Sequence, residues 1–480
     1  MGRWPIVDPP RGCSTMARAV VLTAGMVAEA TGGRLVRGDR THVFAGVSID
    51  TRTLGPGTLF VALRGDRFDA HAFLADAVRA GAAGLLVDTA PDATDATLVI
   101  VVDDTLVALQ ALAGAVRRAS GTRVVAITGS AGKTTTKEVT ADLLRSAGLR
   151  VHRTRGNLNN HIGLPLSLIE LAAGFDVSVV ELGMNHAGEI RTLVAIADPD
   201  VRVWTNVGDA HVGHFGSREA VADAKAEILE NAGPSTVVVA NADDPLVMAR
   251  VRAQGVRALT FGEEPAADVR ATTVVDRGFD GVDAHIASDD EAADVHVPLP
   301  GRANLSNVLA AIAAVRACGV SLARVVPGVA ALRPVVRRGS SHALATGVRV
   351  IDDSYNASPA AVDAALATLA ATPATGRRVA VIGEMLELGS LSDALHEACG
   401  RAAAAAGVSL LIAVGGAPVD ALVRGAMAGG LPAGAIHRFT DSDDAAEAID
   451  RLVVSGDVVL VKGSRGTRTD RVADRLLAVA

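Results

Sequence analysis

Short apolar runs alternate with Ala-rich stretches of helical character along most of the chain. The runs cover residues 123–127, 177–180, 201–205 and 236–240 in the middle of the chain, and 348–351, 378–382, 410–414 and 458–461 towards its C-terminus. Strands buried on both faces read as such continuous runs, and strands that alternate with helices form parallel sheets. The pattern therefore predicts two separate doubly wound α/β units.

The first 121 residues predict a third, smaller α/β unit. Two strand-like stretches flank the turn at residues 55–57, and residues 71–80 have helical character. Residues 333–341 contain Pro and Arg without periodicity and predict a hinge. We therefore expect three domains at residues 1–121, 122–333 and 334–480. Residues 1–16 lack the apolar segment of a signal peptide, and we expect them to be a disordered extension, or Met16 to be the true start.

Composition limits the class of protein. Hydrophobic residues make up 49% of the 480 residues and aromatic residues only 2%, so the predicted cores are aliphatic. The net charge of −7 argues against nucleic acid as a partner. No apolar run reaches the roughly 18 residues of a membrane helix. The three scattered cysteines are too few for a disulfide framework. We expect a soluble, cytoplasmic monomer without a membrane partner.

The sharpest local signal is a glycine-rich turn after a buried strand. Residues 126–137 read Ala-Ile-Thr-Gly-Ser-Ala-Gly-Lys-Thr-Thr-Thr-Lys, and Lys133 and Thr134 begin the predicted helix that follows. The glycines let backbone N–H groups surround a phosphate, the lysine reaches the β- and γ-phosphates, and the hydroxyl binds Mg²⁺. The usual pattern has its first glycine where this chain has Ile127. The segment therefore indicates a shortened P-loop that binds nucleotide.

Two further residues lie just past predicted strands. Glu181 ends the strand that begins at residue 177, and His211 follows the next strand. In open parallel sheets ligands bind beyond the carboxyl ends of the strands, so we expect Glu181 to reach the Mg²⁺ that Thr134 holds. His211 is a candidate ligand of a second metal ion or of a phosphate. The alternative for Glu181 is a solvated glutamate at the strand end, and the alternative for His211 is an ordinary loop histidine.

Eight segments in a fixed order resemble the Mur ligases of peptidoglycan synthesis. They are residues 50–73, the short P-loop, 156–165, 181–190, 299–307, 352–359, 383–389 and 462–465. The resemblance spans residues 24 to about 475, and the stretch 183–189 is similar to the members that add D-alanyl-D-alanine to UDP-N-acetylmuramoyl-tripeptide. It implies an N-terminal domain for the UDP-sugar, a central ATPase domain, and a C-terminal Rossmann-like domain that brings the amine substrate.

The resemblance also implies which residues bind ATP and metal. Lys133 and the loop backbone hold the phosphates, Thr134 and Glu181 hold one Mg²⁺, and His211 helps to hold a second. Arg338 contacts phosphate from the hinge, although the family pattern Pro-Gly-Arg is replaced here by Val-Arg-Arg and Arg337 stays an alternative. The implied ATP-binding residues are Thr128, Gly129, Ser130, Ala131, Gly132, Lys133, Thr134, Asn304, Asn307, Arg338, Asp353, Tyr355 and Asn356.

Lys225 matches the lysine that the family carries as a carbamate, N6-carboxylysine. A carbamate is anionic and offers two hard oxygen ligands to Mg²⁺, whereas a free ammonium repels the metal. The residues alone favour an ordinary surface lysine, since Asp223 and Glu227 flank it. The resemblance reverses that interpretation. Lys225 joins Lys133 and His211 as the residues expected to act in catalysis.

The remaining implied residues concern the two other substrates. The segment on the uridine side is matched by Ser48, Asp50 and Arg52. The loop that meets the muramoyl-peptide is matched by Asn159 and Asn160. After the last strand, Lys462 and Arg465 are candidates to hold the carboxylate of the dipeptide. For the last two residues a solvated loop is the alternative.

The reaction implied by the resemblance is an ATP-dependent ligation. The tripeptide carboxylate attacks the γ-phosphate, and the amine of D-Ala-D-Ala displaces phosphate from the resulting acyl phosphate. The alternatives of the same class are the ligase that adds the third amino acid and a folylpolyglutamate synthetase. The Asn-Pro-Arg motif of diaminopimelate-adding ligases is absent from the sequence. A P-loop switch protein is the alternative of another class, and it leaves the first and third domains without a role.

Overall fold

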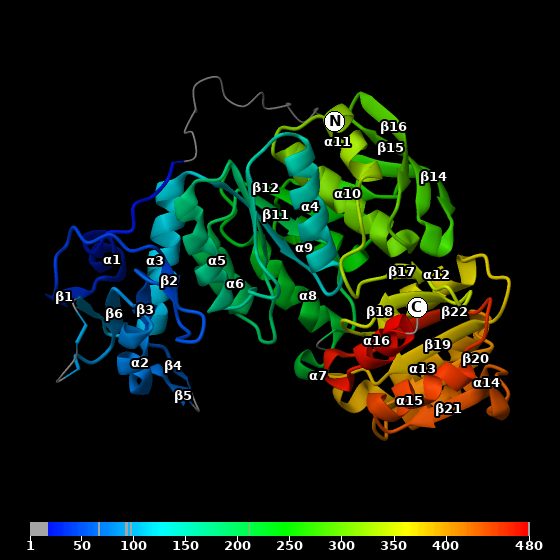
Figure 1. The fold of residues 1–480 in the computed structure, drawn as a ribbon. Helices are drawn as coiled ribbons and strands as arrows, with labels where there is room; N and C mark the ends of the chain where they lie inside the picture. Colours follow the sequence, from blue (N-terminus) through cyan, green and yellow to red (C-terminus); the bar gives the residue numbers. More distant parts are fainter. Residues whose placement is uncertain (1–17, 66–67, 92–94, 97, 211, 479–480) are drawn as a thin grey trace.

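The computed structural model describes residues 18–65, 68–91, 95–96, 98–210 and 212–478, which form three α/β domains (Figure 1). The first domain, in blue, and the third domain, in yellow to red, lie on opposite sides of the central domain. Each domain has its own main sheet, which confirms the predicted fold class. Among the described helices, none is long and apolar enough to cross a bilayer.

The first domain contains a five-stranded sheet in the order β1-β7-β6-β3-β2. Its strands are parallel except β1, which pairs antiparallel with β7. The helix expected over residues 71–80 begins as a 3-10 turn and continues as α2. The elements are α1 (Ala24–Thr31), β1 (Arg34–Arg37), β2 (Val47–Ser48), β3 (Leu59–Val61), β4 (Arg64–Gly65), β5 (Phe68–Asp69), η1 (Ala70–Phe73), α2 (Leu74–Arg79), β6 (Gly84–Val87), β7 (Val99–Val101) and α3 (Thr105–Ser120).

Helix α3 joins the first domain to the central one. Its N-terminus is capped by Asp104, whose carboxylate accepts from the backbone N–H of Leu106 at 2.7 Å. Leu109 and Leu112 of α3 are fully buried in a core that includes residues of the first sheet and of the central helices α5 and α6. The two domains therefore share one continuous apolar core.

Nine strands form the central sheet, in the order β16-β15-β14-β13-β12-β11-β8-β10-β9. Parallel pairing places Glu181 of β10 beside Ile127 of β8, and Trp204 of β11 beside Thr128. The chain passes from β10 to β11 across β8, so the strand order reverses at β8. Ligands of open α/β sheets bind at such a point, beyond the carboxyl ends of the strands.

All four strands predicted for this domain are present with ends within one residue, but β9, β13 and the antiparallel extension β14 to β16 were missed. The strands are β8 (Arg123–Thr128), β9 (Val151–Arg153), β10 (Val177–Glu181), β11 (Val201–Trp204), β12 (Val237–Asn241), β13 (Ala258–Gly262), β14 (Val269–Asp276), β15 (Val282–Ser288) and β16 (Glu291–Val297). The helices are α4 (Lys133–Ser146), α5 (Gly163–Ile169), η2 (Glu170–Ala173), α6 (Glu189–Ala197), α7 (Val212–Phe215), α8 (Arg218–Ala226), η3 (Glu227–Leu229), α9 (Pro245–Ala253), η4 (Gly278–Asp280), α10 (Gly301–Ala317) and α11 (Leu322–Ala330).

The third domain has six strands in the order β17-β18-β22-β19-β20-β21, parallel except for the edge strand β17. Separate apolar cores cover its two faces. The segment expected as a hinge has no helix or strand until β17 begins. The elements are β17 (Ser340–Ala343), β18 (Arg349–Asp353), α12 (Pro359–Ala371), β19 (Arg378–Gly383), η5 (Gly389–Leu391), α13 (Ser392–Ala405), β20 (Leu410–Val414), α14 (Val419–Ala428), η6 (Ala433–Ala435), β21 (Ile436–Phe439), α15 (Ser442–Leu452), β22 (Val458–Lys462), η7 (Arg465–Thr467) and α16 (Asp470–Ala478).

Candidate active site

The turn between β8 and α4 requires glycine at two positions. Gly129 and Gly132 both have positive φ, at 155° and 79°. A Cβ atom on Gly129 would lie 1.9 Å from Thr205 Oγ1, and one on Gly132 would lie 2.0 Å from Asn307 Oδ1. The loop is therefore packed between the end of β11 and helix α10, with no room for a side chain at either glycine. Helix α4 begins at Lys133, as the sequence predicts.

Asn206, directly after β11, fixes the backbone of this loop. Its Oδ1 accepts from Ala131 N at 2.8 Å, its Nδ2 donates to Ala131 O at 3.1 Å, and its carbonyl accepts from Ser130 N at 3.0 Å. Because these two loop N–H groups are engaged, the first turn of α4 supplies the N–H groups for a phosphate. Asn206 was not among the residues predicted for the site. The available signal was an amide side chain directly after the strand next to β8.

Lys133 lies across the loop in this structure. Its Nζ donates to the carbonyl of Gly129 at 2.7 Å. Burial lowers the pKa of Lys133, with the negative charge of Glu181 opposing this effect and the positive charge of Arg338 adding to it. The two charged neighbours come from β10 and from the hinge, so residues far apart in sequence influence this ammonium group.

Thr134, Glu181 and Asn159 form one hydrogen-bonded group beside the loop. Thr134 Oγ1 donates to Glu181 Oε2 at 2.8 Å, and Asn159 Nδ2 donates to Glu181 Oε1 at 2.9 Å. Glu181 is 4% exposed, which excludes the solvated position. A hydroxyl and a buried carboxylate at the phosphate end of a P-loop are hard oxygen donors suited to Mg²⁺. Asn160 instead accepts from Gly163 N at 2.8 Å at the start of α5.

Lys225 is buried, and the surface-lysine interpretation is therefore wrong. Its exposed fraction is 1%, and among the described residues it has no hydrogen-bond or ion-pair partner. Burial lowers the pKa of Lys225 well below its usual range, and the nearby charge of Lys133 lowers it further. A neutral amine is the form that reacts with carbon dioxide, so this environment suits a carbamate. His211, the third predicted catalytic residue, lies outside the described residues.

A cavity of ≈ 790 Å³ lies beyond the loop, between the central and third domains. Its lining joins the P-loop and Glu181 to Asn304 and Asn307 of α10 and to the segment that leads into α12. Asn307 Nδ2 donates to Asn304 Oδ1 at 3.2 Å, and Thr136 Oγ1 donates to Asn307 Oδ1 at 3.3 Å. The volume is that of a site for a nucleotide-sized ligand.

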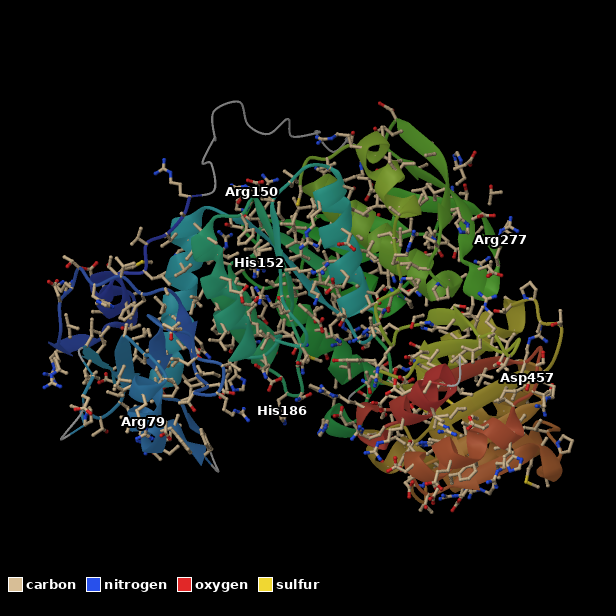
Figure 2. The ribbon with its side chains drawn as sticks, in the orientation of Figure 1. Arg79, Arg150, His152, His186, Arg277 and Asp457 are labelled. Atoms are coloured by element: carbon tan, nitrogen blue, oxygen red, sulfur yellow. The ribbon has the colours of Figure 1, made fainter. Side chains whose placement is uncertain are left out.

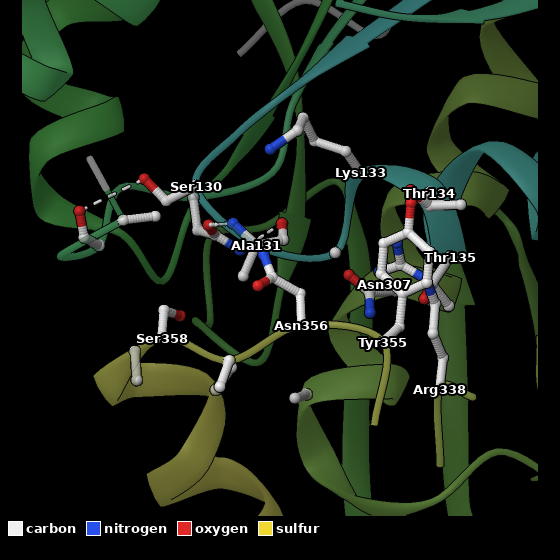
Figure 3. Close-up of a pocket in the computed structure, with 18 of the residues that line it drawn as sticks. Ser130, Ala131, Lys133, Thr134, Thr135, Asn307, Arg338, Tyr355, Asn356 and Ser358 are labelled. Atoms are coloured by element: carbon white, nitrogen blue, oxygen red, sulfur yellow. Dashed lines mark hydrogen bonds between the residues drawn. The ribbon is translucent and has the colours of Figure 1, made fainter. Parts of the chain in front are cut away.

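One of the two arginines of the hinge lies at this cavity. Arg338 lines the cavity, and its guanidinium lies 4.2 Å from the centroid of the Tyr355 ring (Figure 3). Arg337 points to helix α16, where it pairs with Asp470 and, at 2.9 Å, with Asp474. Arg338, and not Arg337, therefore lies near Lys133 and the P-loop.

The third domain contributes an ion pair to the same cavity. Lys462 Nζ donates to Asp353 Oδ2 at 2.6 Å and to the carbonyl of Asn356 at 3.1 Å. Burial raises the pKa of Asp353, although the Lys462 ammonium counteracts this effect. Lys462 is 3% exposed, so the solvated-loop alternative is wrong for it. Arg465 is exposed, with its guanidinium 5.9 Å from the Tyr355 ring centroid.

A second cavity of ≈ 440 Å³ shares Asn160, Gly183 and Glu189 with the first and extends to Leu106 and Gln110 of α3. Because α3 joins the first domain to the central one, this second cavity extends towards the first domain. The loop between β10 and α6 forms one wall of both cavities, and its exposed His186 projects from the central domain into the space between the outer domains (Figure 2). The two cavities therefore adjoin at this loop, one on the side of the P-loop and the other on the side of α3.

The three residues predicted for the uridine side lie apart from these cavities. Ser48 ends β2, and its Oγ accepts from Asp50 N at 3.2 Å. Asp50 pairs with Arg52 at 2.6 Å, and this contact lowers the pKa of Asp50 to about 2. Arg52 has 86% of its side chain exposed and is available to an anionic ligand. The structure brings the three residues together on the first domain.

Comparison with known proteins agrees with this geometry. Residues 127–315 match the Mur ligase middle domain, and residues 337–465 match the Mur ligase, glutamate ligase domain. The UDP-N-acetylmuramoyl-tripeptide--D-alanyl-D-alanine ligase of Escherichia coli (strain K12) is 37% identical over 460 residues, 95% of this chain and 98% of that protein.

Two solved structures extend the likeness to the whole fold. Crystal structure I of MurF from Acinetobacter baumannii has a TM-score of 0.87 at 32% identity and covers 96% of this chain and 99% of that one. The MurF ligase of Thermotoga maritima, solved in complex with ADP, has a TM-score of 0.79 at 29% identity, with 90% and 97% of the two chains covered.

Proposed function

Because this chain belongs to the Mur ligase family, we propose that it uses ATP to join D-alanyl-D-alanine to UDP-N-acetylmuramoyl-tripeptide, a step of peptidoglycan precursor synthesis. Relatives and solved structures that match it over nearly the whole chain are MurF ligases. One observation supports the activity most directly. A single cavity is lined by the P-loop, Glu181 and residues of the third domain, and a second cavity that shares part of this lining extends to α3.

The chemistry explains why ATP is needed. An amine does not displace oxide from a carboxylate at a useful rate. Transfer of the γ-phosphoryl group to the tripeptide carboxylate forms an acyl phosphate and releases ADP. The deprotonated dipeptide amine then attacks the acyl carbon, and phosphate leaves. Positioning and electrostatic stabilisation supply most of the catalysis in such transfers.

The residues of the central domain have distinct roles in this proposal. Lys133 leaves the Gly129 carbonyl and turns to the ATP phosphates when they bind. Thr134, Glu181, His211 and carbamylated Lys225 hold two Mg²⁺ ions. When bound, Mg²⁺ neutralises negative charge on the transferring phosphoryl group. The buried, depressed-pKa environment of Lys225 supports the carbamate.

Residues of the hinge and third domain complete the nucleotide site. Asn304 and Asn307 border the base, and Arg338 contacts phosphate. Asp353, Tyr355 and Asn356 close the cavity from the third domain.

The two other substrates bind on either side of the nucleotide. Ser48, Asp50 and Arg52 bind the uridine end of the acceptor, and Asn159 and Asn160, which line the first cavity, meet its peptide. Exposed Arg465, near the inward-facing Lys462, binds the dipeptide carboxylate. We place this activity in the cytoplasm, in a monomer.

A phosphate-release assay tests the proposal. With ATP and UDP-N-acetylmuramoyl-tripeptide present, release should require D-Ala-D-Ala and should not occur with diaminopimelate, lysine or glutamate. Mass spectrometry should show the pentapeptide product, and Lys133→Ala should abolish both signals. Phosphate release without any amine would favour the switch protein, and release with diaminopimelate or glutamate would favour one of the other ligases.

A further inference from the structure

The turn between β14 and β15 places a side chain of the central domain inside the third domain. Phe279, in the short helix η4, is 8% exposed and is buried in an apolar core with Val362, Leu366 and Leu369 of α12. Of the described residues that precede the hinge, Val212 alone shares this core with it. The two domains therefore touch through an apolar contact separate from the covalent hinge.

Hydrogen bonding fixes this turn to the C-terminal end of α12. Phe279 N donates to Thr372 Oγ1 at 3.0 Å, and Thr372 Oγ1 donates to Thr368 O at 2.7 Å. Gly278 has φ of 65°, and a Cβ atom there would lie 2.2 Å from Thr372 Oγ1. The approach of the two backbones therefore depends on glycine.

Ion pairs flank the same contact. Asp280 accepts from Arg349 of β18 at 2.7 Å, which links the turn to the third sheet. Arg277 donates to Asp283 across the base of the turn at 2.6 Å. The turn is thus braced within the central domain and bonded to the third domain.

The same residues reach the nucleotide cavity. Phe279, Pro300 and Ala303 line it from the central domain, and Ala365 and Thr368 line it from α12. Helix α12 follows the segment that carries Asp353, Tyr355 and Asn356, so a shift of α12 moves that part of the lining as well. A nucleotide that fills this cavity would contact both walls, so its binding would be sensitive to their separation.

We propose that Phe279 and Thr372 are positioning residues that make nucleotide binding depend on the placement of the third domain. This inference rests on the proposed function, in which that domain brings the amine substrate. A ligand that contacts both walls favours the arrangement in which they are held together. By linkage, an occupied nucleotide cavity then raises the affinity for the dipeptide, and the dipeptide raises the affinity for nucleotide.

Substitutions at Thr372 test this positioning role without changing a residue that contacts the nucleotide. It is 1% exposed and is not part of the cavity lining, so a substitution there reaches the nucleotide only through α12. Thr372→Val keeps the shape of the side chain and removes the hydroxyl, whereas Thr372→Ser keeps the hydroxyl. Phe279→Leu keeps an apolar side chain without the ring. Val275→Ala, at a site 47% exposed on β14, is the matched control.

The experiment measures two quantities on the full chain: the Kd for ADP by calorimetry and the KM for D-Ala-D-Ala in the ligation assay. Thr372→Val and Phe279→Leu should each raise both constants about tenfold, within the usual range of coupling between sites. Thr372→Ser and Val275→Ala should keep the wild-type values. Rescue by serine distinguishes the hydrogen bond from a general loss of folding.

One pattern would overturn the inference. If Thr372→Val and Phe279→Leu lower the melting temperature but keep both constants within about twofold of those of Val275→Ala, the contact is structural only. Failure of the proposed function has a different signature: the wild-type chain then binds ADP but forms no pentapeptide product. The ADP measurements still report on the contact in that case.

Discussion

Replacing Gly132 by alanine should disable the phosphate-binding loop while leaving the fold intact. The matched control is Gly148→Ala at the other end of α4. Both glycines have positive φ, 79° and 88°, so alanine meets the same backbone penalty of about 1–2 kcal/mol at each. At Gly148 no atom lies within 4 Å of the added Cβ, whereas at Gly132 the added atom lies 2.0 Å from Asn307 Oδ1.

The difference between the two variants isolates the steric effect. Asn307 is 9% exposed and is bonded to Thr136 and Asn304, so its side chain does not move freely. Relief of the contact requires a displacement of about 1 Å or more in the loop or in α10, since the interior is close-packed. A misplacement of that size at a reacting centre costs about 10²-fold in rate, or about 2.7 kcal/mol of transition-state stabilisation.

Steady-state ligation kinetics and thermal melts test this reasoning. Gly132→Ala should lower kcat/KM for ATP about 10²-fold relative to Gly148→Ala, and both variants should lose similar stability from the backbone term. A Gly132→Ala variant that keeps kcat/KM within about threefold of the control would refute this steric effect, because the clash with Asn307 would then be relieved without displacing the phosphate site.

Two further predictions concern charged residues. In bicarbonate-free buffer, Lys225→Met should raise the free energy of unfolding, and the gain should shrink as the pH rises towards the ordinary lysine pKa. The reason is that burial lowers the pKa of Lys225, so the unfolded chain binds a proton that the folded chain releases; a gain independent of pH in chemical denaturation would contradict this. Arg338→Ala should raise the KM for ATP, whereas Arg337→Ala, which loses its pairs with Asp470 and Asp474, should lower stability by about 1 kcal/mol with the KM unchanged. The opposite assignment would be indicated if Arg337→Ala alone impaired ATP use.

The strands of the two larger sheets were predictable where they are fully buried. Strands β8, β10 and β20 read as continuous apolar runs, because both faces of a parallel sheet are covered. Strand β15 was not found, because buried and half-buried residues alternate along it and Asp and His occupy the less buried positions. Its period of two was present in the sequence, but it occurs in a hairpin at the sheet edge, where no helix follows to complete the expected alternation.

The phosphate-binding part of the site was predictable, because one short sequence motif determines its local structure. The order of glycines, Lys133 and Thr134 required a strand, a turn and a helix, and the structure contains them. The contacts of Asn206 with the loop and of Phe279 with the third domain were not predictable, because each depends on how strands distant in sequence are ordered. The burial of Lys225 likewise arises from tertiary packing, while its acidic neighbours in the sequence suggested a surface position.

Helix α3 has a consequence for dissecting the molecule. Because Leu109 and Leu112 are buried in a core common to the first sheet and the central helices, the first two domains behave as a single folding unit. A chain truncated after α3, or one that begins at β8, would expose a broad aliphatic surface to water. Among the described residues that precede β17, only Val212 and Phe279 enter the buried cores of the third domain, so chimaeras that exchange this domain between relatives are best joined before β17 and matched at these two positions.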